Sequence, residues 1–267
     1  MGALRQLRRL PLAVFYLIVG GLVINLAVLW DQIRGNPVQQ GAARAVQALW
    51  CKGFCRALGI RLRVEGGAIQ PPPVLTISNH VSWLDIVVVA AHWPVAFLSK
   101  SEVARWPIIG RCATGLGTLY IERGRRDAAS RAVESMVRRL DDGDRVLFFP
   151  EGTTGEGHEL LPFRPRLYQA AVDAQAPVQP LALRYLNLDG SVCTEAPFVG
   201  DDGLVSHVAR MCALPGVEAV VSVGEAIVPP HERRSELALQ TREQIAEALA
   251  GMDAVDGAPE LEVERQP

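Results

Sequence analysis

One uninterrupted apolar segment restricts how this chain can fold more than any other feature. Residues 11–30, PLAVFYLIVGGLVINLAVLW, contain no charged side chain. As a helix this segment would be roughly 30 Å long, about the thickness of the hydrocarbon core of a bilayer. No small-residue cleavage site ends it, so a signal peptide is disfavoured. Gly20-Gly21 and the nearly all-round hydrophobicity suit lipid better than a buried core helix. The segment therefore predicts a membrane-associated helix.

A second helical pattern follows the turn signal Gly35-Asn36-Pro37. Between residues 38 and 59, apolar side chains recur at helical spacing, and basic side chains are expected on the opposite side. The expected apolar face is Ala43, Val46, Leu49, Trp50, Phe54 and Ala57, and the expected basic face is Arg44, Lys52 and Arg56. Such a helix can lie in a membrane interface, although an ordinary surface helix shows the same spacing. Beside the apolar segment, we favour the membrane interface.

The basic residues that flank the apolar segment do not determine the membrane topology of this helical pair. Arg5, Arg8 and Arg9 precede the apolar segment, and further basic residues follow it. The comparison of flanking charges is therefore nearly balanced. A hairpin dipping into one leaflet would keep both flanks on the cytoplasmic side, whereas a single span would separate them, and both arrangements remain open.

Length, composition and net charge limit the class of protein to which this chain can belong. At 267 residues, the chain is long enough for one large α/β domain or two small ones. A mean hydropathy of +0.16 is too polar for a multi-span membrane protein, and a net charge of -2 gives no basic field for nucleic acid. The five cysteines and five histidines lack the spacing of metal ligands, so we expect no metal site and no cofactor. The odd cysteine count suits buried, reduced thiols.

Strand and helix patterns alternate from residue 60 onward. Strands are expected at 61–64, 74–77, 95–98, 118–121, 146–149, 178–184 and 217–223, and helices at 84–91, 127–140, 167–174, 204–213 and 236–249. This alternation predicts an α/β fold, with a single domain over residues 60–250 and a mixed, mostly parallel sheet flanked by helices. The membrane-associated helical pair over residues 1–59 precedes it. Residues 251–267 are acidic and lack aromatics, so we expect a disordered tail.

The stretch richest in chemistry is residues 79–85, NHVSWLD. If a helix begins near Ser82, Asp85 lies in its first turn and can turn back toward His80. A carboxylate held against one imidazole nitrogen makes the other nitrogen a better base, which can take a proton from a hydroxyl. A histidine satisfied at a strand end, with an aspartate at a helix N-terminus, is the alternative. On this stretch alone, that alternative is favoured.

Two further blocks place functional groups after predicted strands. In residues 148–154, FFPEGTT, Glu151 follows a strand end, Gly152 allows close backbone approach, and Thr153 and Thr154 add hydroxyl donors. An ordinary polar loop with a turn glycine has the same composition. In residues 117–123, GTLYIER, a short strand delivers Arg123, whose guanidinium is suited to a phosphate or carboxylate. A surface salt bridge is the alternative reading of this arginine.

Taken in order, these blocks resemble the glycerolipid acyltransferase family typified by bacterial 1-acyl-sn-glycerol-3-phosphate acyltransferase (PlsC-like). That family carries N-H-x-x-x-x-D, then G-x-x-[FY]-[IV]-x-R, then F-P-E-G-T, then an apolar segment with V-x-P. The matching residues are Asn79-His80…Asp85, Gly117…Tyr120-Ile121…Arg123, Phe149-Pro150-Glu151-Gly152-Thr153, and Pro177-Val178-Gln179-Pro180. The apolar N-terminus also looks like the membrane-embedded helical pair of this family.

The resemblance implies a reaction, with two partners and a location. An acyl group would move from acyl-CoA or acyl-carrier protein to the hydroxyl of a lysophospholipid, with 1-acylglycerol-3-phosphate as the first expectation and phosphatidate as the product. The enzyme would sit at the bacterial inner membrane with its catalytic domain on the cytoplasmic face. His80 would be the general base, and Asp85 would orient it.

The resemblance also implies a binding site. Glu151 and Gly152, with Thr153, would position the acceptor. Arg123, helped by Lys100 or Arg164, would hold its anionic head group. Backbone amides near His80 or Gly152 are candidates for stabilising the oxyanion. Ser82 lies inside the first motif, but no G-x-S-x-G elbow surrounds it, so a serine hydrolase is disfavoured.

Two departures from the family pattern concern the acceptor. Thr154 stands where phosphatidate-forming enzymes usually carry an arginine, and Phe163-Arg164-Pro165-Arg166 lacks the usual glycine. This pattern is similar to relatives that acylate lyso-ornithine lipids or zwitterionic lysophospholipids, which remain alternative acceptors. A thioester hydrolase and a membrane-anchored binding protein with a decayed site are the remaining alternatives. Intact His80, Asp85 and Glu151 argue against decay.

Overall fold

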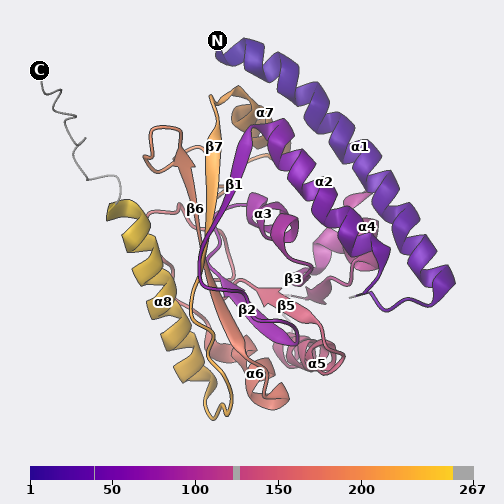
Figure 1. Cartoon of the computed structure of the whole chain (residues 1–267), viewed down its shortest axis with the longest axis vertical. Coiled ribbons are helices and arrows are strands. Elements are labelled where there is room, and N and C mark those ends of the chain that lie inside the picture. The colour runs from indigo at the N-terminus through magenta and orange to yellow at the C-terminus, as the bar shows by residue number, and fades with distance from the viewer. Residues whose placement is uncertain (39, 123–126, 255–267) are drawn as a thin grey trace, which may run out of the picture.

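The computed structural model describes residues 1–38, 40–122 and 127–254. Within them, a seven-stranded sheet has the order β1-β7-β6-β2-β5-β3-β4 (Figure 1). The β6–β7 pair is antiparallel, and every other neighbouring pair is parallel. The strands are β1 (Ile60–Gly66), β2 (Val74–Ser78), β3 (Ala96–Lys100), β4 (Leu119–Ile121), β5 (Arg145–Phe148), β6 (Val178–Asn187) and β7 (Val217–Val223). The mixed, mostly parallel sheet predicted from the sequence is confirmed.

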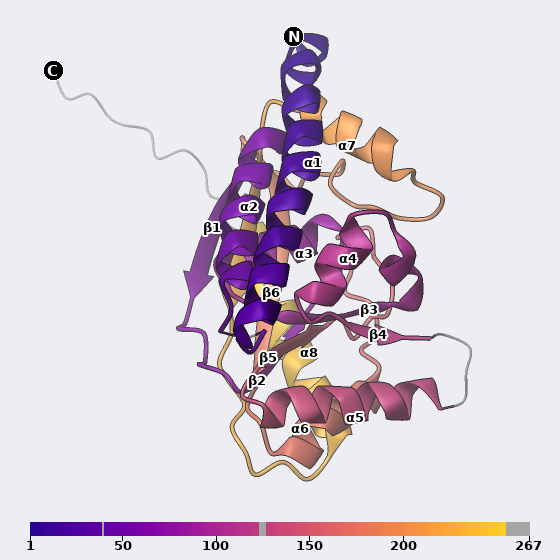
Figure 2. The same cartoon turned by 90° about the vertical axis from the view of Figure 1, so that its right-hand side faces the viewer.

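Helices cover both faces of this sheet (Figures 1 and 2). One core cluster contains buried residues from α2, α3 and α7 and one from α1, and a second contains buried residues from α5, α6 and α8. The helices are α1 (Gly2–Arg34), α2 (Ala42–Leu58), α3 (Leu84–His92), α4 (Ile109–Gly115), α5 (Ala128–Asp141), α6 (Gln169–Ala174), α7 (Leu204–Ala213) and α8 (Arg234–Ala254), with 3-10 turns η1 (Ser101–Arg105) and η2 (Pro165–Tyr168).

Side-chain alternation along the central strands explains the two cores. In β6, Leu181, Leu183 and Tyr185 point into the α2–α3–α7 cluster, whereas Ala182 and Leu186 point into the α5–α6–α8 cluster. Successive residues of a strand face opposite sides of its sheet, so a strand covered on both sides buries its polar as well as its apolar side chains. All of β6 except its last residue is buried, as this geometry requires.

Two boundaries differ from the sequence prediction. The segment after β3 contains η1 and α4, which were not predicted because each is too short to show a clear period. The expected tail begins too early at residue 251, because residues 251–254 continue α8. Leu249 and Met252 are buried in the second core cluster, and their packing extends the helix. The rest of the expected tail, residues 255–267, lies outside the described residues.

The two N-terminal helices pack tightly against each other and against the domain. A Cβ atom on Gly20 would collide with Trp50 of α2, and one on Gly21 would collide with Ile108 before α4. These glycines therefore face protein rather than lipid, contrary to the sequence expectation, since their small size allows close helix contact. The remainder of α1 exposes a long apolar face: Leu4, Leu7, Leu12, Val14, Phe15, Ile18, Val19, Leu22, Val23, Leu26, Leu29, Trp30 and Ile33.

The expected faces of α2 need correction. Arg44 is buried, with 2% of its side chain exposed, and Leu49 is 71% exposed. Arg44 reaches Asp144, whose carboxylate accepts two of its N–H groups over 2.6 and 2.9 Å. This bidentate pair draws Arg44 into the protein and rotates the helix from the expected orientation. Phe54 and Leu58 are in the core, so α2 packs into the core of the α/β fold.

Both ends of α1 are tied to neighbouring helices. Near its start, the Arg5 and Arg9 guanidinium groups donate to the Ala213 and Leu214 carbonyls at the end of α7, over 3.0 and 2.7 Å. Near its end, the Asp31 carboxylate accepts the first amides of α2. Cations suit the carbonyl end of a helix and anions suit the amide end. Among the described residues, α1 is the one helix long and apolar enough to cross a bilayer, and it is held along the side of the domain.

Candidate active site

His80, Glu151 and Lys100 lie at strand ends on one edge of the sheet. β2 and β5 are parallel neighbours, so the loops that follow them, with His80 and Glu151, leave from the same edge. β3 lies beside β5 and ends there with Lys100. Crevices outside the carboxyl ends of parallel strands are where α/β proteins build binding sites. The sheet order therefore gathers blocks that are far apart in the sequence.

His80 and Asp85 form the contact that the sequence predicted. Nδ1–H of His80 donates to Asp85 Oδ2 over 2.7 Å. Asp85 lies in the first turn of α3, and the same oxygen accepts the backbone N–H groups of Val81 and Ser82 over 2.7 and 3.0 Å. These amides lock the carboxylate in place, and the carboxylate in turn fixes the imidazole tautomer with its proton on Nδ1.

Tyr185 is a member of this cluster that the sequence did not reveal. Its hydroxyl donates to Asp85 Oδ1 over 2.7 Å from within β6. Burial, followed by the charge of Asp85, raises the pKa of Tyr185 well above its usual range, so the phenol stays a donor. The sequence carried one signal, an aromatic hydroxyl in a largely apolar buried strand. Such a hydroxyl needs a partner, but a strand alone cannot say which one.

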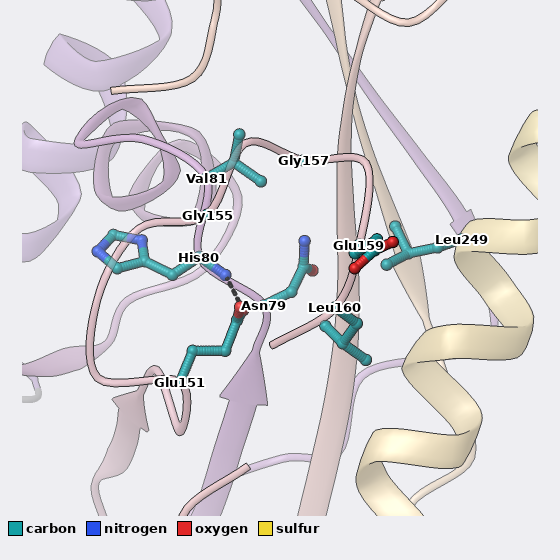
Figure 3. Close-up of a pocket in the computed structure, with 9 residues that line it drawn as sticks. All are labelled: Asn79, His80, Val81, Glu151, Gly155, Gly157, Glu159, Leu160 and Leu249. Atoms are coloured by element: carbon teal, nitrogen blue, oxygen red, sulfur yellow. Dashed lines mark hydrogen bonds between the residues drawn. The ribbon is translucent and has the colours of Figure 1, made fainter. Parts of the chain in front are cut away.

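Hydrogen bonds made by the side chains of Asn79 and Glu151 hold the His80 loop in place. The Asn79 amide exchanges two hydrogen bonds with the main chain of Leu183, over 2.9 and 2.8 Å, and so continues the pairing of β2 with β6. Glu151 Oε1 accepts the N–H of His80 over 2.7 Å (Figure 3), and Oε2 accepts the N–H of Leu161 over 3.2 Å. Glu151 therefore joins the two loops that form the site.

The Glu151 carboxyl is buried, and its ionisation is perturbed. Burial raises its pKa to about 7, although the two backbone N–H groups that it accepts favour the charged form. Its side chain touches the main chain of the His80 loop rather than facing outward, as Figure 3 shows. The geometry thus gives Glu151 an indirect part, in which it positions His80.

The reactive side of the imidazole remains accessible. The His80 ring stacks on Phe149, with centroids 3.9 Å apart and planes 9° from parallel, and the side chain is 18% exposed. Nε2 has no hydrogen-bond partner among the described residues. The stacking on Phe149 and the hydrogen bond from Nδ1 to Asp85 together leave the ring little freedom to rotate. The arrangement presents one fixed, unoccupied basic nitrogen that can accept a proton from a hydroxyl.

The other predicted binding residues differ in how close they lie to His80. Gly152 has a φ of 71°, and a Cβ there would lie 3.5 Å from Nη1 of the exposed Arg164, so these two residues are close. Thr153 is exposed in the same turn, and Lys100 is exposed at the end of β3. No hydrogen bond or ion pair between described residues joins Lys100 to His80 or Glu151. Arg123 lies outside the described residues.

The expected oxyanion donors are already used within the loops. The amides of His80, Val81 and Ser82 donate to side-chain carboxylates, and the amide of Gly152 donates to the Phe149 carbonyl over 3.1 Å. In this conformation, these four amides are therefore not available to donate to an oxyanion. The Ser82 hydroxyl is fully buried and finds no partner among the described residues, so it does not face a substrate.

A shallow pocket lies behind the His80 loop, on the side away from the imidazole. Figure 3 shows the ring of His80 pointing away from Glu159 and Leu249, which help to line this pocket. The Thr154 hydroxyl, from the loop after β5, donates to the Phe198 carbonyl over 2.5 Å and offers no charge to the site.

Comparisons with known proteins show the family and the fold of the chain. The family described as Acyltransferase matches residues 61–184. The lyso-ornithine lipid O-acyltransferase of Pseudomonas aeruginosa is 40% identical, over 77% of this chain and 78% of that protein. The 1-acyl-sn-glycerol-3-phosphate acyltransferase of Neisseria gonorrhoeae is 40% identical, over 64% of this chain and 67% of that protein. The crystal structure of the 1-acyl-sn-glycerophosphate (LPA) acyltransferase PlsC from Thermotoga maritima has a similar fold, with a TM-score of 0.69 at 20% identity, covering 94% of this chain and 98% of that one.

Proposed function

The chain belongs to the acyltransferase family, and on this premise we propose that it is a lysolipid O-acyltransferase. The observation that carries the proposal is the His80–Asp85 pair, which offers one anchored and one unoccupied imidazole nitrogen at the substrate edge of the sheet. A base of this kind activates a hydroxyl, and a lysolipid supplies one. No enzyme nucleophile is needed, since the acceptor oxygen can attack the thioester directly.

The proposed reaction needs one proton to move twice. His80 Nε2 takes the proton of the acceptor hydroxyl while the oxygen forms a bond to the thioester carbonyl carbon. The tetrahedral intermediate then collapses, the carbon–sulfur bond breaks, and the departing thiolate takes the proton from His80. Asp85 stabilises the imidazolium between these steps. The products are the doubly acylated lipid and the free thiol of coenzyme A or the carrier protein.

For the acceptor, we propose a lyso-ornithine lipid in place of the 1-acylglycerol-3-phosphate first expected. The lyso-ornithine enzyme of Pseudomonas aeruginosa matches a larger share of this chain than the Neisseria gonorrhoeae enzyme does, at the same identity. Thr154 supports this choice, because its hydroxyl is bound to the Phe198 carbonyl at a position where a phosphate would favour a cation. The 1-acylglycerol-3-phosphate acceptor remains the second candidate.

Substrate contacts follow from positions around the imidazole. We propose that Gly152, Thr153 and Arg164 contact the acceptor head group, since they cluster in the turns beside His80. Arg123 and Lys100 are further candidates for an anionic group of either substrate. Glu151 contributes by positioning the His80 loop. Acyl-CoA and acyl-carrier protein both supply the required thioester.

The N-terminal helices support a location at a membrane surface. We propose that residues 1–59 anchor the acyltransferase domain of residues 60–250 to the cytoplasmic face of the inner membrane. The exposed apolar face of α1 would lie in one leaflet. A perpendicular span is disfavoured, because α1 is bound to α7 and α2 at its two ends and would carry these helices into the bilayer. This position lets the site reach lipids without extracting them into water.

A lysolipid panel tests the proposal. Purified protein in detergent is given acyl-CoA or acyl-carrier protein with lyso-ornithine lipid, 1-acylglycerol-3-phosphate or lysophosphatidylcholine, and products are resolved by mass. We expect transfer to lyso-ornithine lipid to be fastest and to be lost in His80→Ala. Thiol release at the same rate without any lysolipid would identify a hydrolase instead. Full activity of His80→Ala would overturn the assignment of the base.

A further inference from the structure

We propose that the segment between β3 and the middle of α4 is a second membrane-binding surface, which contacts the anionic head groups of the bilayer beside α1. The surface consists of Arg105, Trp106, Ile108, Ile109 and Arg111, and we refer to it as the Trp106 surface. It rests on the proposed function, in which α1 lies in one leaflet. It adds a site of contact and the chemistry that this site recognises.

Apolar exposure is the first observation. Trp106 is 45% exposed, Ile108 47% and Ile109 37%, in three of four consecutive positions. Large side chains at neighbouring positions of a short connection would normally pack inward, and an exposed group of them marks an interaction surface. Tryptophan in particular favours the boundary between lipid and water.

Backbone strain is the second observation. Ile108 has a φ of 63° and a ψ of −60°, which is an outlier for a β-branched residue. Strain of this kind persists where surrounding structure enforces it, and it concentrates at functional positions. At Ile108, the neighbouring contact is with Gly21 of α1, and much of the side chain still faces outward. The turn therefore displays an apolar side chain at a conformational cost.

Charge is the third observation. Arg105 and Arg111 are exposed on either side of the apolar group, and Lys100 lies just before it. Glu102 is the one acidic side chain between residues 100 and 111, so the segment is basic overall. Basic residues flanking a tryptophan and aliphatic side chains match a membrane whose surface is anionic and whose interior is apolar.

Position connects this surface with α1 and with the active site. Cys112 of α4 donates to the Gly21 carbonyl, and Asn25 of α1 reaches the same sulfur over 3.1 Å. Figure 2 shows α4 beside α1 on the same side of the molecule, so a bilayer that covers the exposed apolar side chains of α1 would lie near the Trp106 surface. The segment also begins at the end of β3, at the edge that holds His80. A bilayer touching both surfaces would bring lipid to the site.

Continuity favours a bilayer over an acidic carrier protein as the occupant. A carrier protein would also find basic and apolar side chains here. However, Ile108 packs at Gly21 of α1, and the exposed apolar side chains of α1 run along a helix of 33 residues. A small acidic partner would leave most of that combined face uncovered, whereas a bilayer covers it all.

Tryptophan quenching tests the apolar part. The full-length protein is reconstituted on vesicles containing bromine-labelled phosphatidylcholine and phosphatidylglycerol, and the quenched share of tryptophan emission is compared for wild type, Trp106→Phe and Trp93→Phe. Trp93 is half-buried at the end of α3 and serves as the matched control. We expect a clear fall in the quenched share for Trp106→Phe and none for Trp93→Phe. An unchanged quenched share in Trp106→Phe would overturn the proposal.

Charge reversal tests the basic part. The double variant Arg105→Glu/Arg111→Glu should partition about tenfold more weakly onto vesicles rich in phosphatidylglycerol, because each basic residue near such a surface contributes measurably. Partition onto phosphatidylcholine alone should change little, and Arg234→Glu on α8 is the matched control. Unchanged partition, with weakened binding of acyl-carrier protein, would assign the surface to the carrier instead. None of these measurements needs turnover, so failure of the proposed catalysis would be seen separately in the lysolipid assay.

Discussion

Tyr185 and His80 bind opposite oxygens of one carboxylate. The Tyr185 hydroxyl donates to Asp85 Oδ1 over 2.7 Å, and His80 Nδ1–H donates to Oδ2 over 2.7 Å. Tyr185 belongs to β6 and Asp85 to the first turn of α3, so this carboxylate links the sheet to the helix above it. The orientation of the His80 imidazole, the proposed base, therefore depends on the sheet as well as on its own loop.

Replacement of Tyr185 by phenylalanine should weaken catalysis and shift its pH dependence. The change leaves Asp85 Oδ1 buried without a hydrogen-bond donor. The negative charge of the carboxylate is then less compensated and attracts the His80 imidazolium more strongly. We expect kcat to fall about tenfold, which corresponds to a loss of one hydrogen bond to a charged group. The acid limb of the kcat/KM profile should move to higher pH, because the imidazolium is then held more strongly. KM for the lysolipid should change less than kcat.

Tyr168→Phe is the matched control for this prediction. Tyr168 is also a buried tyrosine, but its hydroxyl pairs with Thr241 over 2.7 Å in the other core. The two variants should lose similar stability, on the order of 1–2 kcal/mol, in thermal unfolding. Only Tyr185→Phe should alter the pH profile. Equal pH profiles for both variants would show that Tyr185 acts through stability alone.

Asp85→Asn should remove most of the activity while keeping the fold. The asparagine amide can still accept the N–H groups of Val81 and Ser82, but it offers no negative charge to an imidazolium. It also no longer enforces the tautomer that leaves Nε2 basic. We expect kcat to fall by about 10³–10⁴, as for other histidine–aspartate pairs. Association with vesicles should remain at the wild-type level, and a kcat within a factor of about three of wild type would contradict the assigned role.

Glu151 should make stability depend on pH. Burial raises its pKa to about 7 in the folded protein, compared with 4.5 for an ordinary glutamate, so the folded state holds the proton more tightly than the unfolded state. The free energy of unfolding contributed by this group is therefore greatest below about pH 4.5 and falls as pH rises toward 7. The total change is on the order of 3 kcal/mol.

Glu151→Gln isolates this contribution. The variant cannot ionise, so the difference in unfolding free energy between wild type and variant should change across the interval from about pH 4.5 to 7 and stay constant above it. The variant should also lose activity at every pH, since an amide cannot accept both the His80 and the Leu161 N–H groups. A difference that is flat with pH would show that the Glu151 carboxyl is not perturbed.

The sequence predicted the sheet and the His80–Asp85 contact because both depend on local patterns. Apolar strand runs and a carboxylate in the first turn of a helix can be recognised within about ten residues. Tyr185 could not be assigned, since its partner lies 100 positions away and is set by strand order. Arg44 was placed on the wrong face for the same reason. Helical spacing indicated a basic side of α2, whereas the carboxylate that buries Arg44 belongs to the turn before β5.

The Arg44–Asp144 pair gives the final prediction, which concerns how α2 is joined to the catalytic domain. Both side chains are almost fully buried, and Arg139 adds a second contact to Asp144 over 3.4 Å. Arg44→Met leaves the Asp144 charge buried with weaker compensation, so we expect a loss of about 3–5 kcal/mol in urea unfolding. Asp144→Leu alone should cost a similar amount, because it strands Arg44 instead. The double variant Arg44→Met/Asp144→Leu should recover much of the loss, since two apolar side chains need no partner and Arg139 is exposed enough to turn toward water. Strictly additive losses would mean that the pair does not couple α2 to the domain.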